Sequence, residues 1–503
     1  MPSPQRAPDA SPGLSPSPPA DASAPTVVDV AVVGAGIAGL GLAVLLARRG
    51  RESFVVLERG DDVGGTWRDN RYPGVACDVP SHLYSYSFAP RADWSRVFAP
   101  GAEVQEYLRA TAREAGVRPW FGAEVTDARW DEGAGCWHVT SRRGPVRARV
   151  LVLAGGRLSD PRVPDVEGLD AFGGPVFHSA RWDPSADLTG KRVGVVGTGA
   201  SAVQLVPELA RTAGRVVVFQ RSAPYVVPRE DRTYSAAERA AFRADPDLVR
   251  RLREEQFAQM ERGHAARRLV RPDVDALRER ALAHLAAQVP DARLRALLTP
   301  DHEVGCKRVL LSDDFYPALG EPHVDLEPAA LQRLEPGAAV SAAGRRFGLD
   351  VLVLATGFRS TRPLWAQRVR GRHRTLAEHW RDGMTAHAST VVHGFPNMFV
   401  LDGPNASLGH NSAVHVIESQ FGYVLGALDH LAGRAGALEV SERAEREYTR
   451  EIDERARSTV WLRGGCTSWY VDARSGRLTL LWPGTATEFR ERNGVFDPAP
   501  FAA

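Results

Sequence analysis

Two glycine-rich loops constrain the fold of this chain more than any other feature of its sequence. Each loop follows a short run of β-branched residues, typical of a buried parallel strand, and precedes an apolar stretch that favours a helix. Strand, glycine turn and helix in this order form the phosphate-binding part of a dinucleotide-binding unit. The two loops are the only internal repeat in the chain of 503 residues. We therefore expect an α/β protein with two Rossmann-like dinucleotide-binding domains.

The first loop lies in VVDVAVVGAGIAGLGLAVLLARRG. Gly34 makes the tight turn, Gly36 lets the backbone approach a pyrophosphate, and Gly39 lets the helix pack on the strand. The next strand ends in Glu58, 24 positions after Gly34. A carboxylate at this place accepts hydrogen bonds from a ribose diol, so the first unit suits FAD.

The second loop, KRVGVVGTGASAVQLVPELA, carries Gly197 and Gly199, with Ala202 in the third small position. The strand after it ends in Gln220-Arg221-Ser222 and has no acid. An arginine binds a 2′-phosphate through a bidentate fork, whereas an acid repels it. Taken alone, Arg221 would be an exposed strand-end arginine, but after this loop we interpret it as a phosphate ligand. The second unit therefore suits NADPH, and one dinucleotide unit inserted in another suggests a flavin reduced by NADPH.

Composition excludes several other classes of protein. Hydrophobic residues make up 44% and charged residues 25% of the chain, and its net charge is +2. No basic stripe points to nucleic acid, and no apolar run reaches the ~18 residues of a membrane span. The four cysteines are widely spaced without a C-x-x-C pair, and no metal site is expected. This pattern predicts a reduced cytoplasmic protein without disulfides or zinc.

The composition also changes along the chain, from a Pro/Ser/Ala-rich start to an Arg/Glu/Ala/Leu-rich stretch at about 230–300 that predicts a helical insertion. A later strand, LDVLVLATGF, ends in the small turn Ala355-Thr356-Gly357 and is expected to return the chain to the FAD domain. We predict a disordered tail over 1–25, the FAD domain over 26–171, a linker over 172–190, the NADPH domain over 191–348 and the second part of the FAD domain over 349–503.

One motif identifies a family. The linker reads FGGPVFHSARWD, with Phe172, Gly174, His178, Trp182 and Asp183 at fixed spacing. This stretch resembles the fingerprint of the type I Baeyer–Villiger monooxygenases without a mismatch, and it lies between the two glycine loops, as in that family. Similar pieces are GGTWRDNRYPGVACDVPSHLYSYSF (64–88), CKRVLLSDDFYPAL (306–319) and SWYVDARSGRLTLLWPGTATEFR (468–490). The resemblance covers nearly everything from about residue 27 to 495.

The resemblance implies a reaction and its catalytic residues. NADPH reduces FAD, the reduced flavin captures O₂ as a C4a-peroxide, and this attacks a ketone to give an ester or lactone. Arg308, in CKR, matches the family's active-site arginine, which stabilises negative charge without releasing a proton. Asp78, in GVACDVP, matches the carboxylate that orients this arginine. Lys307 is expected to contact the NADPH 2′-phosphate together with Arg221.

The resemblance also implies further cofactor contacts, from Gly65, Thr66, Trp67, Tyr84, Ser201, Thr356 and Gly357. In the linker, His178 is expected to exchange hydrogen bonds with cofactor-side groups, and Trp182 to anchor the joint by burial. We do not expect His178 to act as a chemical acid or base. His410 and Asn411, in the loop 403–412, are either ligands or loop-stabilising residues.

Three other functions fit this sequence less well. A class B flavin monooxygenase making N- or S-oxides shares both loops, but its motif normally ends differently from Trp182-Asp183. A disulfide reductase needs a cysteine pair soon after the first helix, where only Cys77 occurs. A flavin-binding scaffold without activity has no reason to hold Arg221, Lys307 and Arg308 together.

Overall fold

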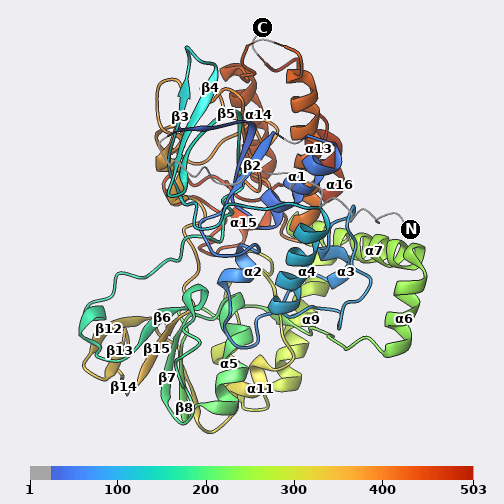
Figure 1. The fold of residues 1–503 in the computed structure, drawn as a ribbon. Coiled ribbons are helices and arrows are strands. Elements are labelled where there is room, and N and C mark those ends of the chain that lie inside the picture. Colours follow the sequence, from blue (N-terminus) through green and yellow to red (C-terminus); the bar gives the residue numbers. More distant parts are fainter. Residues whose placement is uncertain (1–23, 52, 435, 502–503) are drawn as a thin grey trace, which may run out of the picture.

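A computed structural model describes residues 24–501 apart from 52 and 435, and arranges them around two separate main sheets (Figure 1). The predicted disordered tail lies almost wholly outside these residues. The expected α/β class with two dinucleotide-type domains is confirmed. In the described part of the chain, no helix is long and apolar enough to cross a membrane.

The first sheet is mixed, with parallel strands at the first glycine loop. Its strand order is β16-β3-β4-β5-β1-β2, and β17 also pairs with β5. In β1, Val33 lies beside Leu57 of β2 and Leu153 of β5, so these three strands end at one level. The strands are β1 (Thr26–Val33), β2 (Phe54–Leu57), β3 (Val125–Asp131), β4 (Cys136–Ser141), β5 (Gly144–Leu153), β16 (Val369–Arg370) and β17 (Met398–Val400).

Helices of the first domain come from both ends of the chain. In Figure 1, α1 and α13 run side by side next to this sheet, and both bury apolar side chains in the same core. The helices are α1 (Ile37–Arg48), α2 (Thr66–Asp69), α3 (Ser81–Tyr84), α4 (Gly101–Glu114), η3 (Leu364–Arg368), α12 (Leu376–His379), α13 (Ala413–Leu431), α14 (Glu442–Ala456), α15 (Val460–Arg463) and α16 (Ala486–Asn493).

The second sheet is entirely parallel, in the order β11-β8-β7-β15-β6. Val196 of β7 lies beside Phe219 of β8 and Leu354 of β15, so the second glycine loop and Gln220 leave the sheet at one edge. Its strands are β6 (Val176–His178), β7 (Arg192–Val196), β8 (Arg215–Phe219), β11 (Val324–Glu327) and β15 (Val351–Leu354). Beside it lie η1 (Leu169–Ala171), η2 (Ser179–Arg181), α5 (Ala200–Thr212), α11 (Phe315–Leu319) and the hairpins of β12 (Leu331–Glu335), β13 (Ala338–Ser341) and β14 (Arg346–Gly348).

Strand β15 corrects one predicted domain boundary. We expected residue 349 to begin the second part of the FAD domain, yet β15 lies inside the second sheet, between β7 and the linker strand β6. A fully buried apolar strand has the same sequence character in any parallel sheet, so the pattern VLVL did not reveal which sheet it joins. The chain returns to the first domain only after this strand.

The helical insertion is confirmed between the second and first domains. It consists of α6 (Ala236–Ala244), α7 (Pro246–Glu261), α8 (His264–Arg267), α9 (Asp273–Gln288) and α10 (Ala292–Leu298), flanked by the short parallel pair β9 (Val226–Val227) and β10 (Leu310–Leu311). Arg253 of α7 donates to the carbonyl oxygens of His82 and Ser85 at 2.7 and 2.6 Å. The insertion is therefore fastened to the first domain, beside α3 and α4 in Figure 1.

Candidate active site

Both glycine loops line one cavity of about 1070 Å³. Its wall includes Gly34 and Gly36 of the first loop and Gly197 and Gly199 of the second. Pockets for drug-sized ligands reach roughly 1,000 Å³, so this cavity lies at the large end of that range. Its position outside the carboxyl ends of parallel strands is where α/β sheets bind nucleotides.

The first loop permits no side chain at its turn. Gly34 has φ +105°, and a Cβ there would lie 2.5 Å from the carbonyl oxygen of Ala154. A Cβ on Gly39 would lie 1.8 Å from the carbonyl oxygen of Gly34. The roles expected of these glycines from the sequence, a tight turn and close helix packing, agree with this geometry.

Glu58 is buried, and its carboxylate supports the loop itself. One oxygen accepts a hydrogen bond from the Ala35 N–H at 2.8 Å, and the other accepts from Arg68 at 2.5 Å and from the Gly60 N–H at 2.7 Å. Burial disfavours the charged form of Arg68. The neighbouring carboxylates of Glu58 and Asp69 outweigh this effect, so the pKa of Arg68 is raised. Glu58 also lines the cavity, so its predicted contact with a ribose diol stays a prediction.

The segment after the first dinucleotide unit packs against the first glycine loop. Gly65 has φ +51°, and a Cβ there would lie 3.0 Å from the Cα of Gly36. Trp67 donates from its indole nitrogen to the Tyr84 hydroxyl at 3.2 Å, and the two rings meet edge to face. Burial raises the pKa of Tyr84, so its hydroxyl stays protonated. These three residues and Thr66 all line the cavity, as the resemblance implies.

The second loop repeats the turn of the first. Gly197 has φ +111°, and a Cβ there would lie 2.6 Å from the carbonyl oxygen of Ala355. At Gly199, the residue before α5, a Cβ would meet nothing within 4 Å. Ser201, Thr356 and Gly357 also line the cavity. The open space lies at the N-terminus of α5, where free N–H groups attract phosphate.

Two cations lie together beside the second loop. Lys307 contacts the Ser222 hydroxyl, and Arg221 is close enough to depress the pKa of Lys307, although burial is the larger cause of that depression. Among the described residues, no ion pair joins Lys307 or Arg221 to a carboxylate. Two unpaired cations and a hydroxyl at a cavity wall provide what a phosphate dianion requires.

Arg308 and Asp78, 230 positions apart in the sequence, form an ion pair in the wall of the cavity. The Arg308 Nε donates to Asp78 Oδ2 at 2.8 Å, and a terminal nitrogen lies 2.6 Å from the same oxygen. Asp78 raises the pKa of Arg308, with a smaller contribution from Tyr470. About a third of each side chain is exposed, 31% and 34%. The structure thus places a permanent cation at the cavity, oriented by the predicted carboxylate.

The linker motif lies behind the cavity wall. Phe172 is buried, and a Cβ on Gly174 would lie 2.3 Å from the carbonyl oxygen of Asp350. Trp182 packs edge to face on Phe177, and Asp183 accepts hydrogen bonds from Ser185. None of the motif residues lines the cavity. These contacts all lie within the second domain, so the expected role of the motif at the joint between domains stays a prediction.

His178 is the member of the motif that reaches a cavity residue. Its Nδ1 accepts from the Ala180 N–H at 3.1 Å, so Nε2 carries the proton and donates to the Gly357 carbonyl oxygen at 2.9 Å. Burial lowers the pKa of His178. The neutral ring therefore ties β6 to the turn after β15, in keeping with its expected non-catalytic role.

His410 and Asn411 differ in whether they reach the cavity. Both side chains contact Glu261 at the end of α7, with distances of 3.2 Å from His410 Nε2 and 2.9 Å from Asn411 Nδ2. The other Glu261 oxygen accepts from the Thr487 N–H at the start of α16. Only Asn411 of the two lines the cavity. This junction fastens the helical insertion to the first domain.

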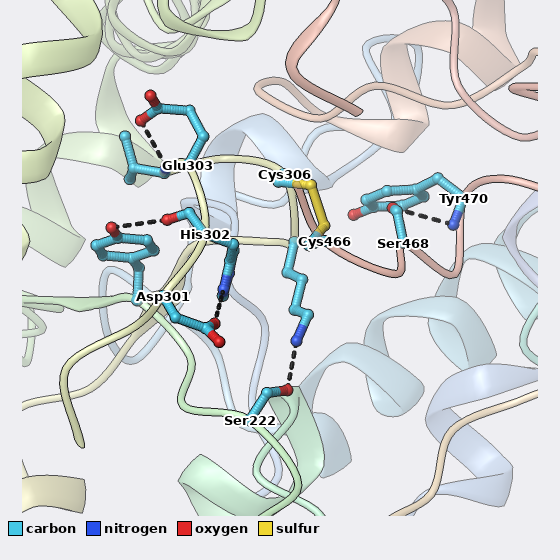
Figure 2. The surroundings of a disulfide bond; sticks show 11 residues. Ser222, Asp301, His302, Glu303, Cys306, Cys466, Ser468 and Tyr470 are labelled. Atoms are coloured by element: carbon cyan, nitrogen blue, oxygen red, sulfur yellow. Dashed lines mark hydrogen bonds and ion pairs between the residues drawn. A yellow bond between two sulfur atoms is a disulfide. The ribbon is translucent and has the colours of Figure 1, made fainter. Parts of the chain in front are cut away.

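Two features of the site are not apparent from the sequence. Arg157 and Asp402 form an ion pair in the cavity wall, and burial raises the pKa of Asp402. The predicted absence of disulfides is wrong, because Cys306 and Cys466 form a disulfide across 160 positions (Figure 2). Widely spaced cysteines gave no signal, since only the tertiary fold brings them together. Cys77 and Cys136 are buried and free.

Comparisons with known proteins agree with this geometry. Residues 31–241 match the family model described as pyridine nucleotide-disulphide oxidoreductase. A Baeyer–Villiger monooxygenase of Streptomyces coelicolor is 46% identical over 94% of this chain and 92% of its own length. One of Pseudomonas aeruginosa is 38% identical over 94% of this chain and 90% of its own length.

Solved structures give the same picture. An oxidised steroid monooxygenase bound to NADP has a TM-score of 0.82 at 33% identity, over 93% of this chain and 97% of that chain. A cyclohexanone monooxygenase from Rhodococcus sp. Phi1 bound to NADP⁺ has a TM-score of 0.82 at 27% identity, with the same shares covered. A third similar structure is a complex with FAD and NADP, at a TM-score of 0.83 and 29% identity.

Proposed function

This chain belongs to the Baeyer–Villiger monooxygenases, and we propose that it uses FAD, NADPH and O₂ to insert an oxygen atom beside a ketone carbonyl, giving an ester or lactone. The alternative considered from the sequence, oxidation of nitrogen or sulfur, is less well supported. Two relatives of this chain, at 46% and 38% identity over 94% of it, carry the Baeyer–Villiger name.

The residues present fit both cofactors. Gly36 and Gly65 face each other through backbone atoms alone, a cradle that side chains would fill. FAD would lie against this cradle, with Glu58, Trp67 and Tyr84 around it. NADPH would lie along the second loop, its pyrophosphate at the N-terminus of α5 and its 2′-phosphate at Arg221, Ser222 and Lys307. When bound, the flavin accepts a hydride from NADPH and activates O₂.

Arg308 supplies the fixed positive charge of the reaction. Negative charge develops on oxygen atoms when an oxygen nucleophile adds to the ketone, and a preoriented cation stabilises that charge. Asp78 keeps the guanidinium oriented, and the raised pKa of Arg308 keeps it protonated at every working pH. Because the cavity is shared by both loops, one arginine can serve both the flavin side and the nicotinamide side.

The single observation that carries the proposal is this ion pair in the cavity between the two loops. We expect Arg308→Ala to retain FAD and its reduction by NADPH, yet to lower ester formation by about 100-fold or more, as loss of an oxyanion-stabilising donor does. Product mass spectrometry with a panel of cyclic and aryl ketones measures this loss. Arg250→Ala, an exposed arginine of α7, is the matched control and should keep wild-type activity. Unchanged ester yield in Arg308→Ala would reject the assigned role.

A further inference from the structure

The Cys306–Cys466 disulfide connects two segments that both reach the cavity. We call residues 299–309 the cation loop and residues 464–470 the C-terminal loop. Lys307 and Arg308 directly follow Cys306, and Trp469 and Tyr470 follow Cys466 by three and four positions. These four residues line the cavity. Figure 2 shows the disulfide between the two loops, with Ser222 on one side and Tyr470 on the other.

The two loops also come together at Arg308. The Tyr470 side chain lies close enough to Arg308 to contribute to the raised pKa of the guanidinium. Arg308 is thus held by a carboxylate of the first domain and lies beside a tyrosine of the C-terminal loop. Its place in the cavity depends on how these loops are fixed to each other.

Backbone contacts between the two loops are few. The Glu303 N–H donates to the Gly464 carbonyl oxygen at 2.8 Å, the one backbone hydrogen bond between them in the described part of the chain. Gly464 packs directly on Cys306, because a Cβ on Gly464 would lie 2.6 Å from the Cys306 Cβ. The disulfide is the remaining strong link, and it lies one residue from Lys307 and two from Arg308.

We propose that the Cys306–Cys466 disulfide is a positioning element that fixes Arg308 and Lys307 against the C-terminal loop, and that it makes oxygenation dependent on thiol redox state. The proposal rests on the proposed function. With the disulfide intact, NADPH oxidation yields ester. With two thiols in its place, the cation loop separates from Tyr470 and less ester forms. The two electrons of each NADPH oxidised without ester formation then reduce O₂ to hydrogen peroxide.

The redox step has a defined direction of attack. Cys306 is fully buried, whereas Cys466 is partly exposed between the exposed residues Gly465 and Thr467. A dithiol reductant therefore attacks the Cys466 sulfur and forms a mixed disulfide there, releasing the Cys306 thiolate. The second thiol of the reductant then closes a cyclic disulfide and releases the Cys466 thiolate. Two electrons pass to the protein, and the two thiolates take up two protons.

The first experiment uses the wild-type holoenzyme in three states: as purified under air, after dithiothreitol treatment and removal of the reagent, and after reoxidation with diamide. Alkylation after denaturation should find two thiols in the first and third states and four in the second. We expect the ester formed per NADPH oxidised to fall by about 10-fold on reduction, because misplacing a catalytic group by 1 Å costs up to ~100-fold. Reoxidation should restore it, with flavin content unchanged throughout.

The second experiment replaces the disulfide by mutation. Cys466→Ser should match the reduced wild type in ester per NADPH and respond to neither reagent. Cys136→Ala, at a free buried cysteine of β4, is the matched control and should respond as the wild type does. Four thiols in the air-purified enzyme, or equal ester per NADPH before and after reduction, would overturn the inference. Failure of the oxidised enzyme to make any ester would instead overturn the proposed function.

Discussion

The two glycine loops have nearly the same backbone but different surroundings. Gly34 and Gly197 have φ values of +105° and +111°, and a Cβ on either would lie 2.5 or 2.6 Å from the carbonyl oxygen after a neighbouring strand. Beyond the loops, Glu58 is buried and bonded to backbone N–H groups, whereas Arg221 is exposed and forms no ion pair in the described residues. The shared turn thus fits a pyrophosphate, and the residue after the next strand distinguishes the two ribose environments.

The third small position also differs between the loops. Gly39 packs so closely that a Cβ would overlap the Gly34 carbonyl oxygen, whereas Ala202 carries its Cβ fully buried in the same place of the second unit. Helix α1 therefore lies closer to its loop than α5 does. We infer that the first unit is the more tightly built of the two, and that it tolerates substitution less.

The largest effect is expected when a methyl group is added at either glycine turn. Gly34→Ala should yield protein without bound flavin, because the new Cβ meets backbone at a positive φ. Gly197→Ala should keep the flavin but lose its reduction by NADPH. Absorbance of the bound flavin and anaerobic reduction measure the two losses separately. Gly133→Ala is the matched control and should retain both functions, because Gly133 lies in the exposed turn between β3 and β4 and a Cβ there would meet only the Asp131 carboxylate, at 3.5 Å. Loss of flavin in Gly197→Ala would contradict the assignment of the loops.

A smaller effect sharpens the difference between the two ribose sites. Arg221→Ala should raise the KM for NADPH by about 10- to 100-fold, since a hydrogen bond to a charged group is worth ~1.5–3 kcal/mol. The KM for NADH should stay unchanged, because NADH has no 2′-phosphate. Steady-state kinetics with both nucleotides measures this. An equal loss for NADH and NADPH would show that Arg221 acts on the loop rather than on the phosphate.

Asp78→Asn tests whether Asp78 orients the Arg308 guanidinium. The amide keeps one acceptor oxygen but removes the charge opposite Arg308, so we expect ester formation to fall by about 10-fold with flavin reduction unchanged. Stopped-flow measurement of flavin reduction, beside product analysis, separates the two steps. A fall in the reduction rate alone would place Asp78 on the nicotinamide side of the reaction instead.

The smallest effect is a pH dependence at the second loop. Burial and Arg221 lower the pKa of Lys307 from its ordinary 10.5, so the ammonium loses its proton below that pH. As pH rises through this lowered pKa, kcat/KM for NADPH should fall, while kcat/KM for NADH should not. Lys307→Arg should remove the pH dependence, because a guanidinium stays charged. An equal fall of kcat/KM for NADPH and NADH would contradict a contact between Lys307 and the 2′-phosphate.

How much the sequence could predict differed between local and long-range features. Both glycine turns, the strands beside them and the insertion follow from local spacing. The family-like pieces CKR and GVACDVP indicate Arg308 and Asp78, which the fold brings together. The sheet of β15 and the Glu58–Arg68 ion pair depend on packing that one strand or one helix does not encode. The Cys306–Cys466 disulfide depends on two loops far apart in sequence.

The crystal structure of the complex with FAD and NADP⁺ is the most direct test. We predict both cofactors in the one cavity, the flavin ring beside the Arg308 guanidinium and the 2′-phosphate within hydrogen-bond distance of Arg221 and Lys307. A flavin ring remote from Arg308, or a 2′-phosphate bound elsewhere, would contradict it.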